Sequence, residues 1–200
     1  LSIGASTIKV AQLKKTKTNW KLEKFSSVPL TEAPSEHREI SNVVSTVQAI
    51  QEAMAQADIS SKDVCSAIAG SGIIIKNLTI TVADMKELQD QVFWEAEQYI
   101  PFDISEVVID YQVTKQGQDN QVDVILVAVK KEYLEQYMSV IEEALLQPKI
   151  IDAEVFALQN SFETNYPVTD TEATLLADIG ALSTKIMSCA GGIPYFTNDA

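Results

Sequence analysis

The sequence predicts a mixed α/β fold in which strand hairpins alternate with amphipathic helices and one hairpin signature occurs twice. The first copy is residues 2–10, SIGASTIKV, and the second is residues 178–186, DIGALSTKI. In each copy an apolar run reaches a glycine, passes small or hydroxyl residues and continues as a strand-like segment, which is typical of a tight hairpin. Between the copies, apolar residues recur every two residues in some segments and about every 3.6 residues in others, as they do when strands and helices alternate.

The N-terminal segment should form strands over residues 8–13 and 20–28, joined by a lysine-rich turn and ended by prolines. A loop with the only histidine, His37, follows. The next segment predicts a helix, because apolar residues recur at three- and four-residue steps. These residues are Ile40, Val43, Val44, Val47, Ile50 and Met54. A buried strand over 64–69 then ends at a Gly-Ser-Gly turn.

The middle of the chain predicts a sheet with one helix. Residues 74–82 alternate apolar and polar side chains, which indicates a half-exposed strand. Asp84 should cap a helix that Pro101 ends. Its apolar stripe contains Met85, Leu88, Val92, Ala96 and Tyr99. Strands over 107–113 and 122–129 should follow as a hairpin.

Two further helices are expected over residues 131–147 and 152–163, each with an apolar stripe. The polar stretch 165–172 then resembles a hinge. The second signature begins a second meander, whose strands are expected over 175–177, 184–190 and 193–197. No helix follows to cover this sheet. We therefore expect the sequence to hold about one and a half domains of a larger duplicated protein whose extreme N-terminus is also missing.

Composition excludes several function classes. The formal net charge of −13 disfavours nucleic acid and most contact with anionic lipid, so any link to a membrane should run through a partner protein. The one local exception is the basic segment of Lys14, Lys15, Lys17, Lys21 and Lys24, which could touch an anionic surface but is expected to be a solvated hairpin tip. No run approaches the roughly 20 apolar residues that span a bilayer, which predicts a soluble protein. Cys65 and Cys189 are expected to be buried free thiols without a metal or disulfide role.

The repeated hairpins are the candidate site. Glycine lets the backbone approach an anion and direct its N–H groups at it, and hydroxyl groups add donors. Two such hairpins facing each other would hold the phosphates of a nucleotide from both sides, although Gly4 and Gly180 could also be ordinary turn glycines. Trp94 lies off the stripe of its helix, so it either packs against the inserted sheet or is exposed for a partner; packing is the expectation, because large aromatic side chains are usually mostly buried. Glu95 and Glu97 point in different directions on a helix and are expected to be solvated.

With both signatures in place, the chain resembles the superfamily of actin, Hsp70 and sugar kinases. The segments between the signatures narrow the resemblance to the PilM family, the cytoplasmic actin-like proteins of type IV pilus assembly, which are similar to FtsA. These segments are residues 91–102 (QVFWEAEQYIPF), 107–111 (VVIDY), 123–128 (DVILVA) and 149–158 (KIIDAEVFAL). The resemblance implies an actin-like ATPase (ribonuclease H-like) fold with an FtsA-type inserted subdomain, in a chain truncated in its second half.

The resemblance also implies domains, ligands and partners. Residues 1–73 and 148–168 would form the first actin-like domain (1A), residues 74–147 the inserted 1C-type subdomain, and residues 169–200 the start of the second domain (2A). The family is expected to bind ATP and Mg²⁺ between its halves. It is also expected to dock the cytoplasmic N-terminal tail of PilN, and to contact pilus motor or platform proteins and copies of itself. These roles place the protein in the cytoplasm, peripheral to the inner membrane.

Ten residues carry over as nucleotide ligands. The first hairpin would contribute Gly4, Ala5, Ser6, Thr7 and Lys9, and the second Asp178, Gly180, Ala181, Ser183 and Thr184. Asp178 would also hold magnesium through water. The family usually has an acidic residue where this chain has Ser2, and a neutral hydroxyl binds a hard cation far more weakly. We therefore expect little or no ATP hydrolysis. The alternatives are an ATPase or kinase of the superfamily and an interaction module that no longer binds nucleotide.

Overall fold

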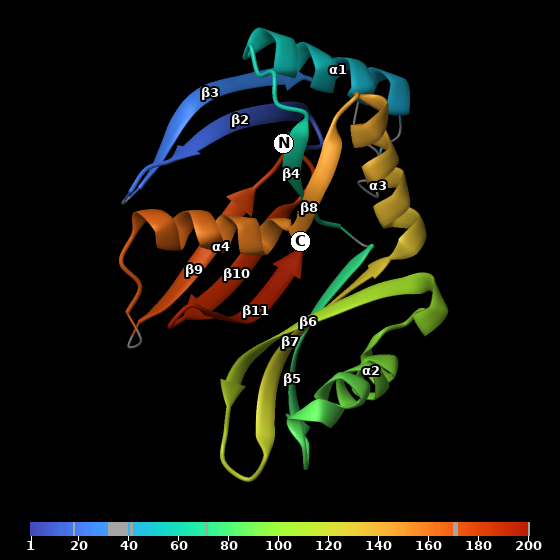
Figure 1. The fold of residues 1–200 in the computed structure, drawn as a ribbon, viewed down its shortest axis with the longest axis vertical. Helices are drawn as coiled ribbons and strands as arrows, with labels where there is room; N and C mark the ends of the chain where they lie inside the picture. Colours follow the sequence, from blue (N-terminus) through green and yellow to red (C-terminus); the bar gives the residue numbers. More distant parts are fainter. Residues whose placement is uncertain (18, 32–39, 41, 71, 170–171, 200) are drawn as a thin grey trace. The chain divides into compact units, whose positions relative to one another are not determined.

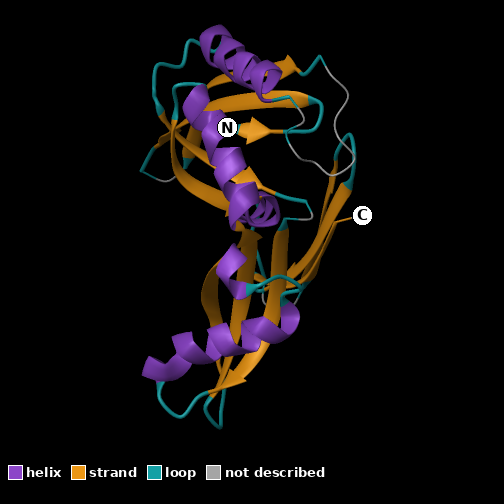
Figure 2. Ribbon diagram, turned by 90° about the vertical axis from the view of Figure 1, so that its right-hand side faces the viewer, coloured by secondary structure: helices purple, strands orange, loops and turns teal. Residues whose placement is uncertain are grey.

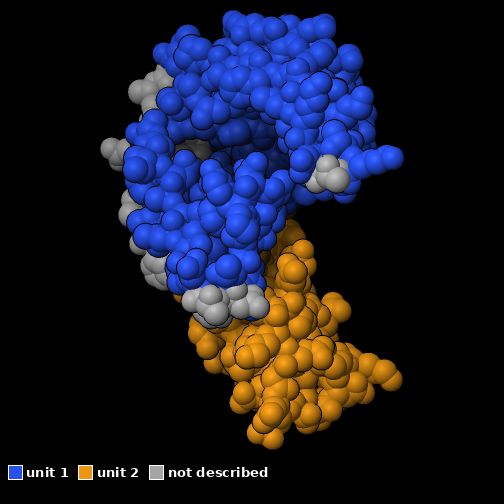
Figure 3. Space-filling model, turned by 90° about the vertical axis from the view of Figure 1, so that its left-hand side faces the viewer, with its two compact units in different colours: residues 1–70, 135–200 blue, residues 71–134 orange. Residues whose placement is uncertain are grey.

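The molecule consists of two compact units. The computed structural model describes residues 1–17, 19–31, 40, 42–70, 72–169 and 172–199, so the predicted histidine loop lies outside the described residues. Unit 1 is formed by Leu1–Gly70 and Glu135–Ala200, and unit 2 by Ser71–Leu134 (Figure 3). The predicted insertion, residues 74–147, begins near the start of unit 2 but extends beyond its end. None of the described helices is long and apolar enough to cross a membrane.

The first half of unit 1 is a three-stranded antiparallel meander covered by a helix. Its elements are β1 (Ser2–Ile3), β2 (Thr7–Lys15), β3 (Trp20–Pro29), α1 (Val43–Gln56) and β4 (Asp63–Ile68). Alternation along the strands turns Ile8, Val10 and Val28 to one face, where they are buried. Helix α1 contacts both β2 and β3 and buries its own apolar face (Figure 1). Its N-terminus is capped by Asn42, whose side chain accepts a hydrogen bond from the Ser45 N–H.

Strand β4 pairs in parallel with β8 (Gln147–Ala153). Parallel neighbours need a long connection, and here it contains unit 2 and α3 (Lys131–Glu143). The Tyr137 hydroxyl of α3 donates a hydrogen bond to the Ala67 carbonyl of β4 at 2.9 Å. This contact explains why most of α3 belongs to unit 1 and not to the insertion. The predicted helix through residue 147 is too long, and β8 was not predicted, because Pro148 and Lys149 interrupt its apolar run.

The second half of unit 1 is a second antiparallel meander. Its elements are α4 (Glu154–Asn165), β9 (Ala173–Ile179), β10 (Thr184–Ala190) and β11 (Ile193–Asp199). Strand β10 lies between β9 and β11, as in the first meander, where β2 lies between its two partners. Helix α4 crosses this sheet in Figure 1 and contacts β9 and β10. The buried Gln159 of α4 donates a hydrogen bond to the Gly192 carbonyl at 2.7 Å.

Unit 2 is a three-stranded antiparallel sheet with a helix on one face (Figure 2). Its elements are β5 (Ile73–Thr81), η1 (Met85–Glu87), α2 (Leu88–Tyr99), η2 (Ile104–Glu106), β6 (Val107–Gln116) and β7 (Gln121–Lys130). The predicted cap, Asp84, accepts a hydrogen bond from the Lys86 N–H and opens a short 3₁₀ turn before α2. The core forms where Leu88, Val92 and Ala96 meet the central strand β7, whose Leu126 is fully buried.

Several predictions of burial are wrong. Trp94 is 61 % exposed and not part of the core, and Met85 and Tyr99 at the two ends of the predicted stripe are also exposed. Leu145, which belongs to the apolar stripe of the predicted helix over residues 131–147, is exposed because α3 ends at Glu143 and Leu145 takes a left-handed conformation with φ 63°. Both cysteines are free, as expected, but Cys65 is exposed and only Cys189 is buried.

Truncation of Leu126 tests whether unit 2 depends on this core. We expect Leu126→Ala to lower the free energy of unfolding by about 2–5 kcal/mol, because it leaves a cavity in the middle of the sheet. Leu175→Ala is the matched control, since Leu175 is 68 % exposed on β9, and it should change stability by less than about 0.5 kcal/mol. Urea unfolding measures both. Equal effects of the two substitutions would contradict the assigned core.

Candidate functional site

The first repeated signature forms a tight turn between β1 and β2. Ile3 pairs with Ile8, so the turn consists of four residues, Gly4 to Thr7. The Gly4 N–H donates a hydrogen bond to the Thr7 carbonyl at 3.0 Å. A Cβ atom on Gly4 would lie only 2.9 Å from that carbonyl oxygen, which is closer than real side chains approach. Glycine is therefore required at position 4 by the close return of the backbone.

The second signature forms the same turn between β9 and β10. Ile179 pairs with Thr184, and the Gly180 N–H donates to the Ser183 carbonyl at 3.0 Å. A Cβ atom on Gly180 would lie 3.0 Å from the Ser183 oxygen. The prediction of two hairpins is confirmed, down to the position of the glycine in each turn. Gly4 and Gly180 thus have the same geometric role, which is to allow the close return of the turn backbone.

The polar groups of the two hairpins differ in exposure. On the first hairpin Ser6 and Lys9 are exposed, whereas Gly4, Ala5 and Thr7 are half-buried. On the second, the exposed residues are Asp178, Gly180 and Ala181, and the half-buried ones are Ser183 and Thr184. Both hairpins belong to unit 1, whose surface is hollowed on the face shown in Figure 3. The N–H groups of Gly4 and Gly180 already donate within their turns, so other turn N–H groups and the exposed Lys9 would be the donors to an anion.

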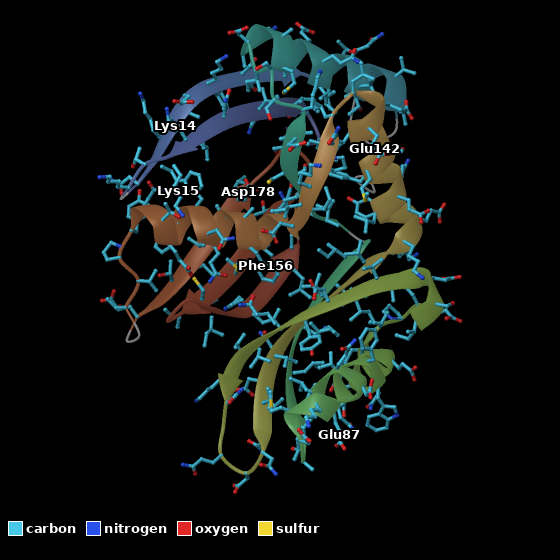
Figure 4. All side chains as sticks on the ribbon, viewed as in Figure 1. Lys14, Lys15, Glu87, Glu142, Phe156 and Asp178 are labelled. Carbon is cyan, nitrogen blue, oxygen red and sulfur yellow. The ribbon has the colours of Figure 1, made fainter. Side chains whose placement is uncertain are left out.

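Lys185 forms an ion-pair cluster that the sequence pattern did not predict. Its Nζ lies 2.9 Å from Oδ2 of Asp178, which is labelled in Figure 4, and also pairs with Oε2 of Glu154 at the start of α4. Only 11 % of the Lys185 side chain is exposed. The alignment of the two repeats places Lys185 at the position of Lys9, and this was the one feature of the sequence that could have marked Lys185 as a candidate site residue. Nothing in the local sequence indicated that Glu154, 31 positions away, would meet it.

The cluster keeps Lys185 charged. Burial lowers the pKa of Lys185, but hydrogen bonds and charge interactions with Glu154 and Asp178 outweigh it, so the pKa lies above its ordinary value. The predicted magnesium residue Asp178 therefore already has a cationic partner. Within the described part of the chain, no three His, Cys, Asp or Glu side chains are grouped so that they could hold a metal ion. The residues of this arrangement do not form a protein-built magnesium site.

The two hairpins are equivalent in backbone but not in charge. Asp178 and Lys185 face each other across the second hairpin, whereas the corresponding pair across the first is Ser2 and Lys9. Serine cannot neutralise a lysine, and Lys9 is exposed. The first hairpin thus presents a cation to the solvent, and the second presents an ion pair. An anion such as a phosphate would meet more favourable electrostatics at the first hairpin.

Comparison with known proteins gives the family. A family model described as type IV pilus assembly protein PilM matches residues 1–197. The solved structure of a PilM-PilN type IV pilus biogenesis complex matches with a TM-score of 0.88 and 26 % identity, over 99 % of this chain and 59 % of that chain. The present chain therefore spans 59 % of the length of that relative.

A second solved structure supports the fold alone. It is the cytoplasmic domain of EpsL, an inner membrane component of the type II secretion system of Vibrio cholerae, with a TM-score of 0.57 and 17 % identity over 100 % of this chain and 68 % of that chain. Together these matches confirm the predicted actin-like ATPase fold. The match over nearly all its residues shows that this chain belongs to the PilM family of type IV pilus assembly proteins.

Proposed function

We propose that this protein is a nucleotide-binding platform of type IV pilus assembly that docks the cytoplasmic N-terminal tail of PilN. The PilN partner is supported by the similarity of 99 % of this chain to a subunit of a PilM-PilN complex. Contacts with pilus motor or platform proteins, self-association and a cytoplasmic position at the inner membrane remain predictions from the resemblance.

The nucleotide part of the proposal depends on one observation, the pair of equivalent hairpins. Each has a glycine whose N–H donates a hydrogen bond to the carbonyl three residues on, and a Cβ atom would lie 2.9 Å from that oxygen at Gly4 and 3.0 Å from it at Gly180. Two turns with the same backbone geometry in one unit support the proposal of a common ligand with several anionic groups. ATP fits this description, with Lys9 and the turn N–H groups as donors to its phosphates.

Turnover is expected to be slow or absent. Ser2 supplies no carboxylate on the first hairpin, and Asp178 on the second is paired with Lys185. Magnesium enters the proposal only as the ion that ATP carries on its phosphates, with Asp178 as its ligand through water. Loss of one preorganised electrostatic contact costs about 10²- to 10³-fold in rate at comparable sites. A scaffold role needs binding only and is compatible with this arrangement.

One observation favours the alternative of an interaction module without nucleotide. Because Lys185 neutralises Asp178, the second hairpin, residues 178–186, offers neither an unpaired carboxylate to a metal nor an additional free cation to a phosphate. An ATPase or kinase of the superfamily is not favoured by any feature of the hairpins. A measurement of ATP binding distinguishes the platform, which should bind ATP, from the interaction module, which should not. A measurement of ATP hydrolysis distinguishes both from an ATPase or kinase.

The partner can be tested by calorimetric titration with a synthetic peptide that copies the cytoplasmic tail of PilN. We expect saturable one-to-one binding, and no binding of a scrambled peptide of the same composition. A change in affinity on addition of ATP would show that the two sites are coupled. Absence of peptide binding by a protein shown to be folded by circular dichroism would contradict the docking role.

The hairpins can be tested by fluorescence titration with a labelled ATP analogue. Gly4→Ala and Gly180→Ala should each weaken binding by at least about tenfold, because the new Cβ atom displaces the turn N–H groups. Lys9→Gln, which leaves the turn intact, should also weaken it. Gly117→Ala is the control, since its Cβ atom would lie 3.4 Å from the nearest atom in a turn of unit 2. If all variants bind like the parent protein, the hairpins do not hold the nucleotide.

The Lys185 cluster predicts a pH dependence. Because the folded-state pKa of Lys185 is raised, its contribution to stability is fully present below its ordinary value of 10.5 and is lost as the pH rises through the higher folded-state value. Lys185→Met should lower the free energy of unfolding by about 1–3 kcal/mol at neutral pH, since it leaves two carboxylates unpaired. The difference from the parent protein should narrow above pH 10.5.

The control for this measurement is Lys149→Met. Lys149 lies 3.5 Å from Asp63, but its side chain is 53 % exposed, so its loss should cost less than about 0.5 kcal/mol. Urea unfolding at several pH values measures both variants. Equal stability of Lys185→Met and the parent protein at neutral pH would mean that Asp178 is not held by the cluster.

A further inference from the structure

The β2–β3 hairpin has a charge opposite to the rest of the chain. Residues 7–29 contain six of the fifteen Lys and Arg residues and one of the 28 acidic residues, Glu23. This segment therefore has a formal charge of +5, whereas the remainder of the chain has nine basic and 27 acidic residues and a charge of −18. The positive charge of this hairpin attracts anionic surfaces, whereas the negative charge of the rest of the protein repels them.

The same hairpin exposes large apolar side chains on one face. Leu13 pairs with Leu22, and Lys15 pairs with Trp20, so these side chains share the face opposite the buried Ile8 and Val10. The exposed fractions are 55 % for Leu13, 51 % for Trp20 and 56 % for both Leu22 and Phe25. Helix α1 covers the base of the other face. These apolar residues thus have no partner among the described residues that would bury them.

The lysines at the end of the hairpin contribute little to the stability of the fold. Lys14 and Lys21 are directly opposite each other across the strands, and like charges in this position are destabilising. Lys14 lies 3.9 Å from Glu23 with 68 % of its side chain exposed, which is a weak ion pair. Lys15 lies over the Trp20 ring, 5.5 Å from its centroid. Figure 4 shows Lys14 and Lys15 at the free end of β2.

We propose that this basic tip, consisting of Lys14, Lys15, Lys17 and Lys21 with the apolar side chains of Leu13, Trp20 and Leu22, binds the surface of a membrane rich in anionic lipid. Lysines attract anionic headgroups, and tryptophan is favoured at the boundary between headgroups and acyl chains. Charge complementarity selects an anionic surface, and the exposed Leu and Trp side chains next to the lysines select one with an apolar layer beneath it. An acidic soluble protein would satisfy only the lysines.

The strong negative charge of the remaining chain does not prevent this contact. Interactions between exposed charges are largely screened beyond about 8 Å at physiological ionic strength. Lys24 pairs with Asp58, just after the end of α1, at 3.0 Å. The tip residues lie further along the hairpin than this ion pair. The proposal is independent of nucleotide and of PilN, and it adds a direct membrane contact to the expected contact through a partner.

Vesicle flotation of the 200-residue chain tests the proposal. Vesicles of equal parts phosphatidylglycerol and phosphatidylcholine should bind the protein at low salt, and vesicles of phosphatidylcholine alone should not. Substituting the four tip lysines (Lys14→Gln, Lys15→Gln, Lys17→Gln and Lys21→Gln) should weaken binding by at least about tenfold. The control substitutes four other exposed lysines, Lys62→Gln, Lys76→Gln, Lys86→Gln and Lys115→Gln, which gives the same net charge and should leave binding within about twofold of the parent protein.

Tryptophan fluorescence tests the apolar part of the contact. The chain has two tryptophans, so a Trp94→Phe background leaves Trp20 as the only one. Its emission should shift to the blue on anionic vesicles, and Leu22→Ser should reduce both the shift and the binding. No binding to anionic vesicles, equal loss in the two lysine variants or an unchanged Trp20 emission would overturn the proposal. So would binding to soluble poly-glutamate without binding to vesicles, which would indicate an acidic protein partner.

Discussion

Parallel pairing between β4 and β8 is the constraint on which the rest of the molecule depends. Parallel neighbours cannot be joined by a tight turn, so the chain must leave the end of one strand and return to the start of the other by a long connection. In this protein the connection contains all of unit 2 as well as α3. The pairing of Asp63–Ile68 with β8 holds both ends of this connection in place. A unit with its own core can therefore be inserted there without changing how the strands of unit 1 pair.

The same pairing positions part of the candidate site. Strand β8 ends at Ala153, opposite Ile68, and α4 begins at the next residue, Glu154. Glu154 can therefore reach Lys185 on β10, which is nearly buried and needs compensating charge. The result is an electrostatic connection between α4 and the second hairpin. The first hairpin has no such connection among the described residues, so two turns with one backbone geometry present different charges to a ligand.

The distribution of charge is as informative as its total. A net charge of −13 describes a generally acidic surface, yet six of the fifteen basic residues lie on one hairpin. Exposed lysines cost little to keep because they remain solvated, so such a segment is tolerated by the fold without being required by it. The two hairpin turns and this basic tip are thus separate surfaces of unit 1. They are suited to different ligands, one to a compact polyanion and the other to an extended anionic layer.

The sequence by itself determined the features that depend on neighbouring residues. Glycines at positions 4 and 180, four-residue turns around them and the helices with clear apolar periodicity follow from local backbone geometry and side-chain spacing. Only the tertiary structure decided the features that join distant residues: the parallel strand β8, the pairing of Glu154 with Lys185, and the exposure of Trp94 and Cys65. The physical reason is that burial and ion pairing depend on which segments pack together, and periodicity within one segment does not contain that information.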